Sequence, residues 1–396
     1  MRRKARLVPI LTAIAGSTLL STTIAHGATA DATSGVTAGA TADATSGATA
    51  GATADATSGA TAGATADATA GGGTAANESG VTPARAVPQP VEKEAADTKK
   101  EQQTVQRYWT EAKMEAAKPL AALVPEKDGA RLTAGAIAAQ AAADPVSVPA
   151  TEPDGDTVTA AKGSAAVRAS TGTAWTRGGA IVKTAGRVFF TYQGRNASCS
   201  ANAVTSENKS TVITAGHCVR MGGAFHGNWV FVPGYQNGDR PYGTWVATTL
   251  YTTPQWNNSE DVNYDVASAV VAPLNGRSLT DVVGGQGVSF NQARRRQMHS
   301  FGYPAAAPYD GSKLVYCAGR AFDDFLMSRD IGLNCNMTGG SSGGPWFLDF
   351  NESTGLGTLN SVNSFKYAFA TGWMFGPYFG TEARAVYEAA QTTGAP

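Results

Sequence analysis

Short runs of apolar, aromatic and β-branched residues dominate the chain beyond about residue 173. Clusters of Gly, Asn, Pro and Ser separate these runs, as is typical of strands and tight turns in antiparallel barrels or sandwiches. The clearest runs are RVFFTY (187–192), STVITAG (210–216), NWVFVPG (228–234), TWVATTLYT (244–252) and DVASAVV (265–271). The pattern predicts an all-β domain over residues 171–396.

Helical periodicity is clear only near the end of the sequence. In GTEARAVYEAAQTTG (380–394), Ala383, Val386, Tyr387 and Ala390 fall on one face of a helix. The expected fold is therefore an all-β body with one C-terminal helix.

The first thirty residues have the layout of a secretory signal peptide. Four basic residues among the first six precede an apolar stretch, and small residues follow up to Ala30. A membrane anchor is the alternative, but Gly, Ser and Thr dilute the apolar run. We expect residues 1–30 to be removed on export, no stable membrane insertion, and an extracellular location.

Residues 31–74 repeat a twelve-residue unit, such as ADATSGATAGAT, with small variations. Fixed-period repeats can form solenoids, but this unit offers almost no large apolar side chain whose burial could offset the entropy of ordering the chain. We predict a disordered tether. The composition leaves attachment to a cell wall open.

Residues 75–170 are first punctuated by proline and then become charged and rich in alanine. Thr110 followed by Glu111, with Met114 spaced for one face, predicts a short capped helix that ends before Pro119. A plain linker is one interpretation. The position in front of the β domain favours the other, a pro-segment that masks a site or assists folding.

Composition narrows the choice of partners and cofactors. The chain has 31 basic and 31 acidic side chains, so no nucleic acid or anionic membrane partner is expected. Four cysteines in an exported chain predict disulfides; three pairings are possible, and we favour Cys199–Cys218 with Cys317–Cys335. Without an HExxH motif or spare cysteines and histidines, no metal and no cofactor is expected.

A histidine follows one of the apolar strands directly. The motif TAGHC delivers His217 beside Cys218. The other histidines of the β domain, His226 and His299, have no such motif around them, and we interpret them as surface or core residues. His217 is therefore the candidate for chemistry.

An aspartate begins another apolar strand, in the motif NYDVASAVV. Asp265 would bury a charge at considerable cost unless it is hydrogen-bonded. A carboxylate that accepts the Nδ1 hydrogen of an imidazole meets that need and stabilises the imidazolium formed during a reaction. Asp265 is the predicted partner of His217, and Asp261 is the fallback candidate.

A glycine-flanked serine completes the set, in GGSSGGPW (339–346). Glycines can hold Ser342 on a tight, exposed turn where backbone N–H groups point toward a reacting carbonyl. The amides of Gly340 and Ser342 would form that oxyanion hole.

Together, TAGHC, NYDVASAVV and GGSSGGPW resemble the three signatures of the trypsin/chymotrypsin superfamily of serine peptidases, especially its bacterial trypsin-like and glutamyl-endopeptidase-like branches. The resemblance covers about residues 175–390 and implies two antiparallel six-stranded β-barrels. It implies a secreted, monomeric endopeptidase acting on polypeptides, with His217 as general base, Asp265 as its orienting residue and Ser342 as nucleophile.

Two rival functions use the same residues. A catalytically silent relative could serve as a binding or adhesion module, and an esterase could use the same triad. The GxSxG pattern around Ser342 also fits an α/β-hydrolase, but that fold needs a histidine after the serine, and no histidine follows Ser342.

The match departs from the family pattern before the nucleophile, where Ser341 replaces an aspartate that captures a new N-terminus in many relatives. Activation is therefore expected to depend on removing the pro-segment, with Arg168 and Arg177 as candidate cleavage sites. By analogy, four residues bind substrate in a pocket that we predict to be polar and neutral: Asn336, Thr338, Ser361 and Asn363.

Overall fold

A computed structural model describes residues 87–123, 143–153 and 169–396 of the chain. The predicted signal peptide (1–30) and repeat (31–74) lie outside the described residues. Among the residues that are described, no helix has the length and apolar character needed to cross a bilayer.

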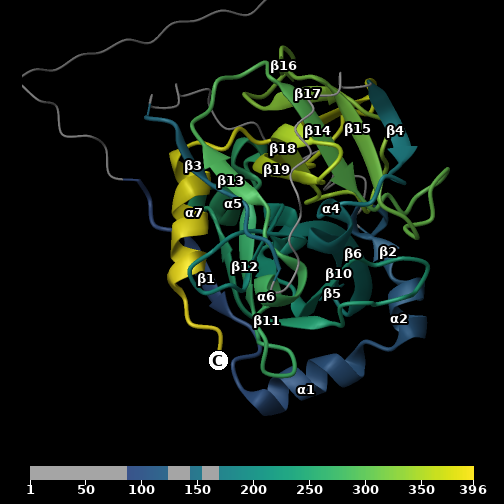
Figure 1. The fold of residues 1–396 in the computed structure, drawn as a ribbon, viewed down its shortest axis with the longest axis vertical. Coiled ribbons are helices and arrows are strands. Elements are labelled where there is room, and N and C mark those ends of the chain that lie inside the picture. The colour runs from purple at the N-terminus through teal and green to yellow at the C-terminus, as the bar shows by residue number, and fades with distance from the viewer. Residues whose placement is uncertain (1–86, 124–142, 154–168) are drawn as a thin grey trace, which may run out of the picture. The chain divides into compact units, whose positions relative to one another are not determined.

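Six antiparallel strands close into a barrel that forms the first half of the β body (Figure 1). The ring closes because β11 pairs with both β10 and β12. Its strands in ring order are β5 (Ala185–Tyr192), β6 (Arg195–Ala203), β7 (Thr211–Thr214), β12 (Ala267–Val271), β11 (Trp245–Thr252) and β10 (Gly227–Pro233). The five apolar runs of the sequence all fall on these strands, as predicted.

The second half consists of two sheets. The larger, in spatial order, is β3 (Val146–Val148), β13 (Gly287–Phe290), β19 (Leu356–Val362), β18 (Pro345–Asn351), β14 (Gln297–Gly302), β15 (Val315–Arg320) and β4 (Ser170–Ala174). The smaller contains β16 (Phe322–Asp323), β17 (Ile331–Asn334) and β20 (Trp373–Gly376). A bridge between Phe365 and Phe375 links the segment after β19 to the smaller sheet. The all-β class is confirmed, while the expected second barrel takes the form of two sheets rather than one continuous ladder.

Short helices and turns connect the strands, and one long helix ends the chain. The predicted C-terminal helix is confirmed as α7 (Thr381–Thr392), which buries Ala383, Val386, Tyr387 and Ala390. The shorter elements are α4 (Ile181–Thr184), η2 (Gly216–Cys218), β8 (Arg220–Met221), β9 (Ala224–Phe225), α5 (Pro254–Ser259), η3 (Val262–Tyr264) and α6 (Leu279–Val283).

Both predicted disulfides are present. Cys199 on β6 is bonded to Cys218, and Cys317 on β15 is bonded to Cys335 at the end of β17. Each closes a short loop, which stabilises the fold by about 3 kcal/mol in the chain-entropy treatment. The first bond ties the turn that carries His217 to the barrel.

The described part of the predicted pro-segment contacts both halves of the β body. Its strand β3 pairs with β13 in the larger sheet of the second half, and its other elements lie on the barrel side. These are β1 (Val91–Glu94), α1 (Lys99–Tyr108), α2 (Glu111–Ala116), β2 (Lys118–Pro119) and η1 (Leu120–Ala122). The capped helix is confirmed, because Thr110 accepts a hydrogen bond from the backbone N–H of Lys113 and α2 ends before Pro119. β1 pairs with β11, and β2 lies parallel to β6. Trp109 anchors the segment: its indole N–H donates to the Asn228 carbonyl (2.5 Å).

Asp330, just before β17, carries a buried carboxyl group. Its side chain is fully buried, and neither carboxyl oxygen has a hydrogen-bond partner among the residues that the structure describes. Burial, with a smaller contribution from neighbouring carboxylates such as Asp265, raises the pKa of Asp330 well above its usual value. The unfolded chain ionises this group near pH 4, whereas the folded chain keeps the proton. Its contribution to stability is therefore present at acid pH and is lost as pH rises.

Asp330→Asn is expected to raise the free energy of unfolding at neutral pH, because the amide has no proton to lose. The gain in the free energy of unfolding over the native chain should grow by up to about 1.4 kcal/mol per pH unit above pH 4, until the pH reaches the raised pKa of Asp330. Urea unfolding at pH 5 and pH 8 measures it, with Asp349→Asn, an exposed aspartate, as control. An equal response of both variants at both pH values would contradict this assignment.

Candidate active site

His217 lies on the tight turn that follows β7. The apolar strand Thr211–Thr214 is fully buried and leads directly into η2, where the backbone turns sharply. Gly216 is required at this turn, because a Cβ there would lie 2.7 Å from the Trp256 ring and 2.9 Å from Oδ1 of Asp265. The turn therefore brings the backbone of His217 into direct contact with the carboxylate of Asp265.

Asp265 holds this histidine through two hydrogen bonds. Its Oδ2 lies 2.7 Å from Nδ1 of His217, and its Oδ1 accepts the backbone N–H of the same residue at 2.8 Å. The hydroxyl of Ser364 also donates to Oδ2. The carboxylate is only 1% exposed, so these three donors supply the hydrogen bonding that the sequence argument required. Asp261 instead accepts from Asn263 in its own turn.

Ser342 lies on a tight turn in which two neighbouring positions require glycine. Gly340 and Gly343 have φ of 99° and 77°, in the region that favours glycine. A Cβ on Gly343 would lie 2.0 Å from Oγ1 of Thr214 and 2.9 Å from the backbone nitrogen of Ala215. The serine turn is thus packed directly against the end of β7, the strand that leads to His217.

Two backbone carbonyl groups of the serine turn accept hydrogen bonds from Ser200, while two of its backbone N–H groups have no acceptor among the described residues. Ser200 on β6 donates its backbone N–H to the Ser342 carbonyl (2.7 Å) and its hydroxyl to the Gly340 carbonyl (2.9 Å). Within the described part of the chain, the N–H groups of Gly340 and Ser342 donate to no protein acceptor. These are the two amides predicted to form the oxyanion hole.

The four predicted substrate-binding residues fall into two groups. Asn336 is exposed, and its Oδ1 accepts from the Tyr309 hydroxyl (2.6 Å). Thr338 is half-buried, and its hydroxyl donates to the Ala306 carbonyl (2.6 Å). Ser361 and Asn363, in contrast, are completely buried.

Asn363 stabilises the serine turn through hydrogen bonds of its side-chain amide. Its amide donates to the carbonyls of Phe301 (2.8 Å) and Ser341 (3.0 Å), and its oxygen accepts from Ser300 and Trp346. Ser361 likewise uses its hydroxyl on the Pro377 carbonyl (2.8 Å). Both side chains therefore make their hydrogen bonds inside the protein, whereas Asn336 and Thr338 lie nearer the surface.

Two polar side chains near the site make contacts that the sequence does not predict. Ser364 donates to Asp265, and Lys366 places its half-buried ammonium between the carbonyls of Cys335 (2.8 Å) and Thr371 (2.6 Å). Burial lowers the pKa of Lys366 to about 8. The region predicted to be neutral therefore contains a cation. Neither residue belongs to a local motif, so only the three-dimensional arrangement reveals them.

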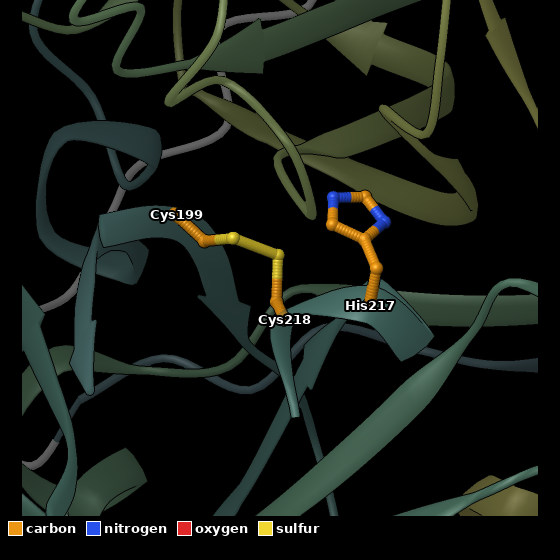
Figure 2. A group of neighbouring side chains, drawn as sticks. All are labelled: Cys199, His217 and Cys218. Atoms are coloured by element: carbon orange, nitrogen blue, oxygen red, sulfur yellow. A yellow bond between two sulfur atoms is a disulfide. The ribbon is translucent and has the colours of Figure 1, made fainter. Parts of the chain in front are cut away.

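His217 also lies beside a disulfide. Figure 2 shows its imidazole next to Cys199 and Cys218, and one atom of each residue lies within 4.8 Å of the others. The two sulfur atoms are bonded to each other, so neither is a thiolate that could bind a metal. The group braces the histidine turn and lacks the free ligands of a zinc site.

No protein-family model matches the chain. The crystal structure of the protease Anisep from Arthrobacter nicotinovorans is similar, with 46% sequence identity and a TM-score of 0.53 over 56% of this chain and 100% of Anisep. The thermostable serine protease AL20 from an extremophilic microorganism is 43% identical, with a TM-score of 0.52 over 54% of this chain and 100% of AL20. An extracellular metalloprotease of Bacillus subtilis (strain 168) is 42% identical over 62 residues, or 15% of this chain and only 19% of that relative's length.

The fold and these likenesses define the class of the protein as a chymotrypsin-like protease. Since the whole of Anisep and the whole of AL20 are matched at more than 40% identity, the chain belongs to their family, the bacterial chymotrypsin-like serine peptidases.

Proposed function

We propose that the chain is a secreted serine endopeptidase whose triad is His217, Asp265 and Ser342. The observation that carries the proposal is the 2.7 Å contact between Nδ1 of His217 and the buried carboxylate of Asp265. It fixes the imidazole with Nε2 free to act as a base, while Gly343 packs the serine turn against β7. The Anisep and AL20 likenesses support the serine-protease assignment.

In the proposed reaction, the hydroxyl of Ser342 attacks the carbonyl carbon of a peptide bond, and Nε2 of His217 accepts its proton. The amides of Gly340 and Ser342 stabilise the oxyanion of the tetrahedral intermediate. His217 then protonates the leaving amine, which leaves an acyl group on Ser342. Water, activated by the same histidine, hydrolyses this ester and restores the enzyme.

A fluorophosphonate probe tests this function directly. After the pro-segment has been removed, the probe should label the protein stoichiometrically on the peptide containing Ser342, and Ser342→Ala should abolish labelling. A silent binding module would take up no probe, and labelling at another residue would contradict the proposed nucleophile. Hydrolysis of casein as well as simple acyl esters identifies a peptidase, whereas activity on esters alone would identify an esterase.

We further propose that the chain is made as a precursor, with a signal peptide (1–30), a tether (31–74), a pro-segment (75–170) and the peptidase domain (171–396). The two disulfides support export to an oxidising compartment. So does the extracellular relative, within the short stretch that it matches. The proposed enzyme is a monomer that acts on polypeptides and needs no cofactor.

Contacts of the described pro-segment support masking as its role. β2 lies against β6, and a Cβ placed on Gly339 would meet Pro119 at 3.2 Å and Ala121 at 3.4 Å. Gly339 directly precedes Gly340 of the proposed oxyanion hole. The pro-segment therefore covers one side of the entrance to the serine turn.

Ser341 supports activation without capture of a new N-terminus. Its side chain is buried, and its hydroxyl donates to the Thr338 carbonyl (2.8 Å) within the same turn. Of the two candidate cleavage sites, Arg168 lies outside the described residues. Arg177 pairs with Glu352 and follows β4, so a cut there would separate β4 from the sheet that it completes. Cleavage before β4 is favoured.

A further inference from the structure

His226 lies in the connection between β9 and β10, outside every motif of the sequence. Its ring is 6% exposed and stacks on Phe190, with ring centroids 4.4 Å apart and an interplanar angle of 7°. The edge of Tyr192 closes a second side. Such packing alone would suit an inert core histidine.

The hydrogen bond of His226 sets it apart from a core histidine. Its Nε2 lies 2.8 Å from the backbone carbonyl oxygen of His217. A carbonyl oxygen can only accept, so Nε2 of His226 carries the proton. The backbone N–H of the same residue donates to the Val219 carbonyl at 2.8 Å. His226 therefore holds both ends of the turn on which the proposed catalytic imidazole stands.

Two further ring N–H groups hold this turn in the same way. The indole of Trp229 donates to the Cys218 carbonyl (3.0 Å), and the indole of Trp256 donates to the Arg220 carbonyl (2.8 Å). Buried carbonyl groups without partners are costly, so each donor stabilises one backbone conformation. His226 is the donor that acts on His217 itself.

We propose that His226 is a positioning residue for catalysis, which fixes the backbone of His217 through its neutral Nε2–H tautomer. This inference rests on the proposed function of His217 as general base. Small displacements of a catalytic group reduce turnover strongly, because the reactive geometry must be held within fractions of an ångström. Loss of the donor should thus lower kcat more than it changes KM.

The neutral state of His226 follows from its surroundings. Burial lowers its pKa to about 4, although the hydrogen bond to the His217 carbonyl acts in the opposite direction. A cavity of about 610 Å³ under the pro-segment borders its ring, and the charged residues of that cavity are Lys93, Glu94, Lys100 and Glu101. The donor is therefore present throughout the pH range in which a serine peptidase with a neutral histidine base works.

His226→Phe is made in the full chain and assayed after the pro-segment has been cut and removed; it tests the proposal because it keeps the stacked ring and removes the donor. His299→Phe is the matched control, since His299 is also buried, also stacks on aromatic rings and also has a pKa of about 4, but bonds to Glu352 instead. Turnover is expressed per active site titrated with the fluorophosphonate probe, so that misfolded molecules do not count.

We expect kcat per titrated site to fall by about 10- to 100-fold in His226→Phe with little change in KM, and to stay near the native value in His299→Phe. The acidic limb of the pH–rate profile should also move only in the first variant. His226→Gln, which restores an N–H donor, should recover part of the loss and serves if the Phe variant does not fold. Equal kcat in His226→Phe and His299→Phe would overturn the proposal, as would a kcat in His226→Gln no higher than in His226→Phe. If the Phe variant does not fold, His226→Gln is compared with a matched His299→Gln variant, and equal kcat in these two would overturn the proposal. Absence of titratable sites in the protein without substitutions, after removal of the pro-segment, would instead overturn the proposed function.

Discussion

Asp265→Asn is expected to lower kcat by roughly 10⁴-fold with little effect on KM. The carboxylate accepts hydrogen bonds from the backbone N–H and Nδ1–H of His217 and from the Ser364 hydroxyl. An amide has a single oxygen acceptor and would present N–H groups to the imidazole, which favours the wrong tautomer. Steady-state kinetics on a short peptide substrate, normalised to folded protein, measures the effect.

Asp261→Asn is the matched control for this experiment. Asp261 is also buried, stands four residues earlier in the same loop and was the alternative partner suggested by the sequence. Its carboxylate accepts from Asn263 rather than from the histidine. Its amide variant should retain kcat within a few fold. A collapse of kcat in Asp261→Asn, with Asp265→Asn still active, would reverse the assignment.

Removal of the pro-segment should produce the second largest change. An attached segment acts at an effective concentration in the millimolar range, so a micromolar affinity would leave roughly one molecule in 10³ open. To test this, the recognition site of a specific protease is introduced between residues 154 and 168 of the full chain. The chain is then cut at this site, and the pro-segment is removed. Peptide hydrolysis is expected to rise by about 10²- to 10³-fold on removal.

A variant in the anchor of the pro-segment separates masking from assistance in folding. Trp109 is 1% exposed, packs against Phe189 and donates to the Asn228 carbonyl. Trp109→Ala should loosen the pro-segment and activate the uncut chain in part, whereas Gln106→Ala, on the exposed face of α1, should not. A cut and purified domain that remains folded yet no more active than the uncut chain would refute masking.

The local parts of the site could be predicted from sequence because each is encoded within a few residues. The strand before His217, the apolar run after Asp265 and the glycines around Ser342 fix their backbones over short distances. The helix at residues 381–392 was predictable for the same reason, since its periodicity is local, and the observed disulfides are the favoured one of the three pairings that the sequence allowed.

The remaining parts depend on contacts between distant segments, which a single sequence does not reveal. Ser364 stands 99 positions from Asp265, and Asn363 stands 22 positions from Ser341. The substrate contact of Asn363 stays a prediction, and its buried amide also supports the serine turn through bonds that the sequence does not reveal. His226 was interpreted as a core or surface residue because its bond to the His217 carbonyl involves the backbone, which carries no residue signature.

The most direct test of the central claim is to trap the acyl intermediate. The active protein is mixed with an activated acyl ester, quenched in acid within milliseconds and analysed by intact mass and peptide mapping. The account predicts one acyl group per molecule, attached to the peptide containing Ser342 and absent from Ser342→Ala. Continued turnover without an acyl group at Ser342, or an acyl group on another residue, would contradict it.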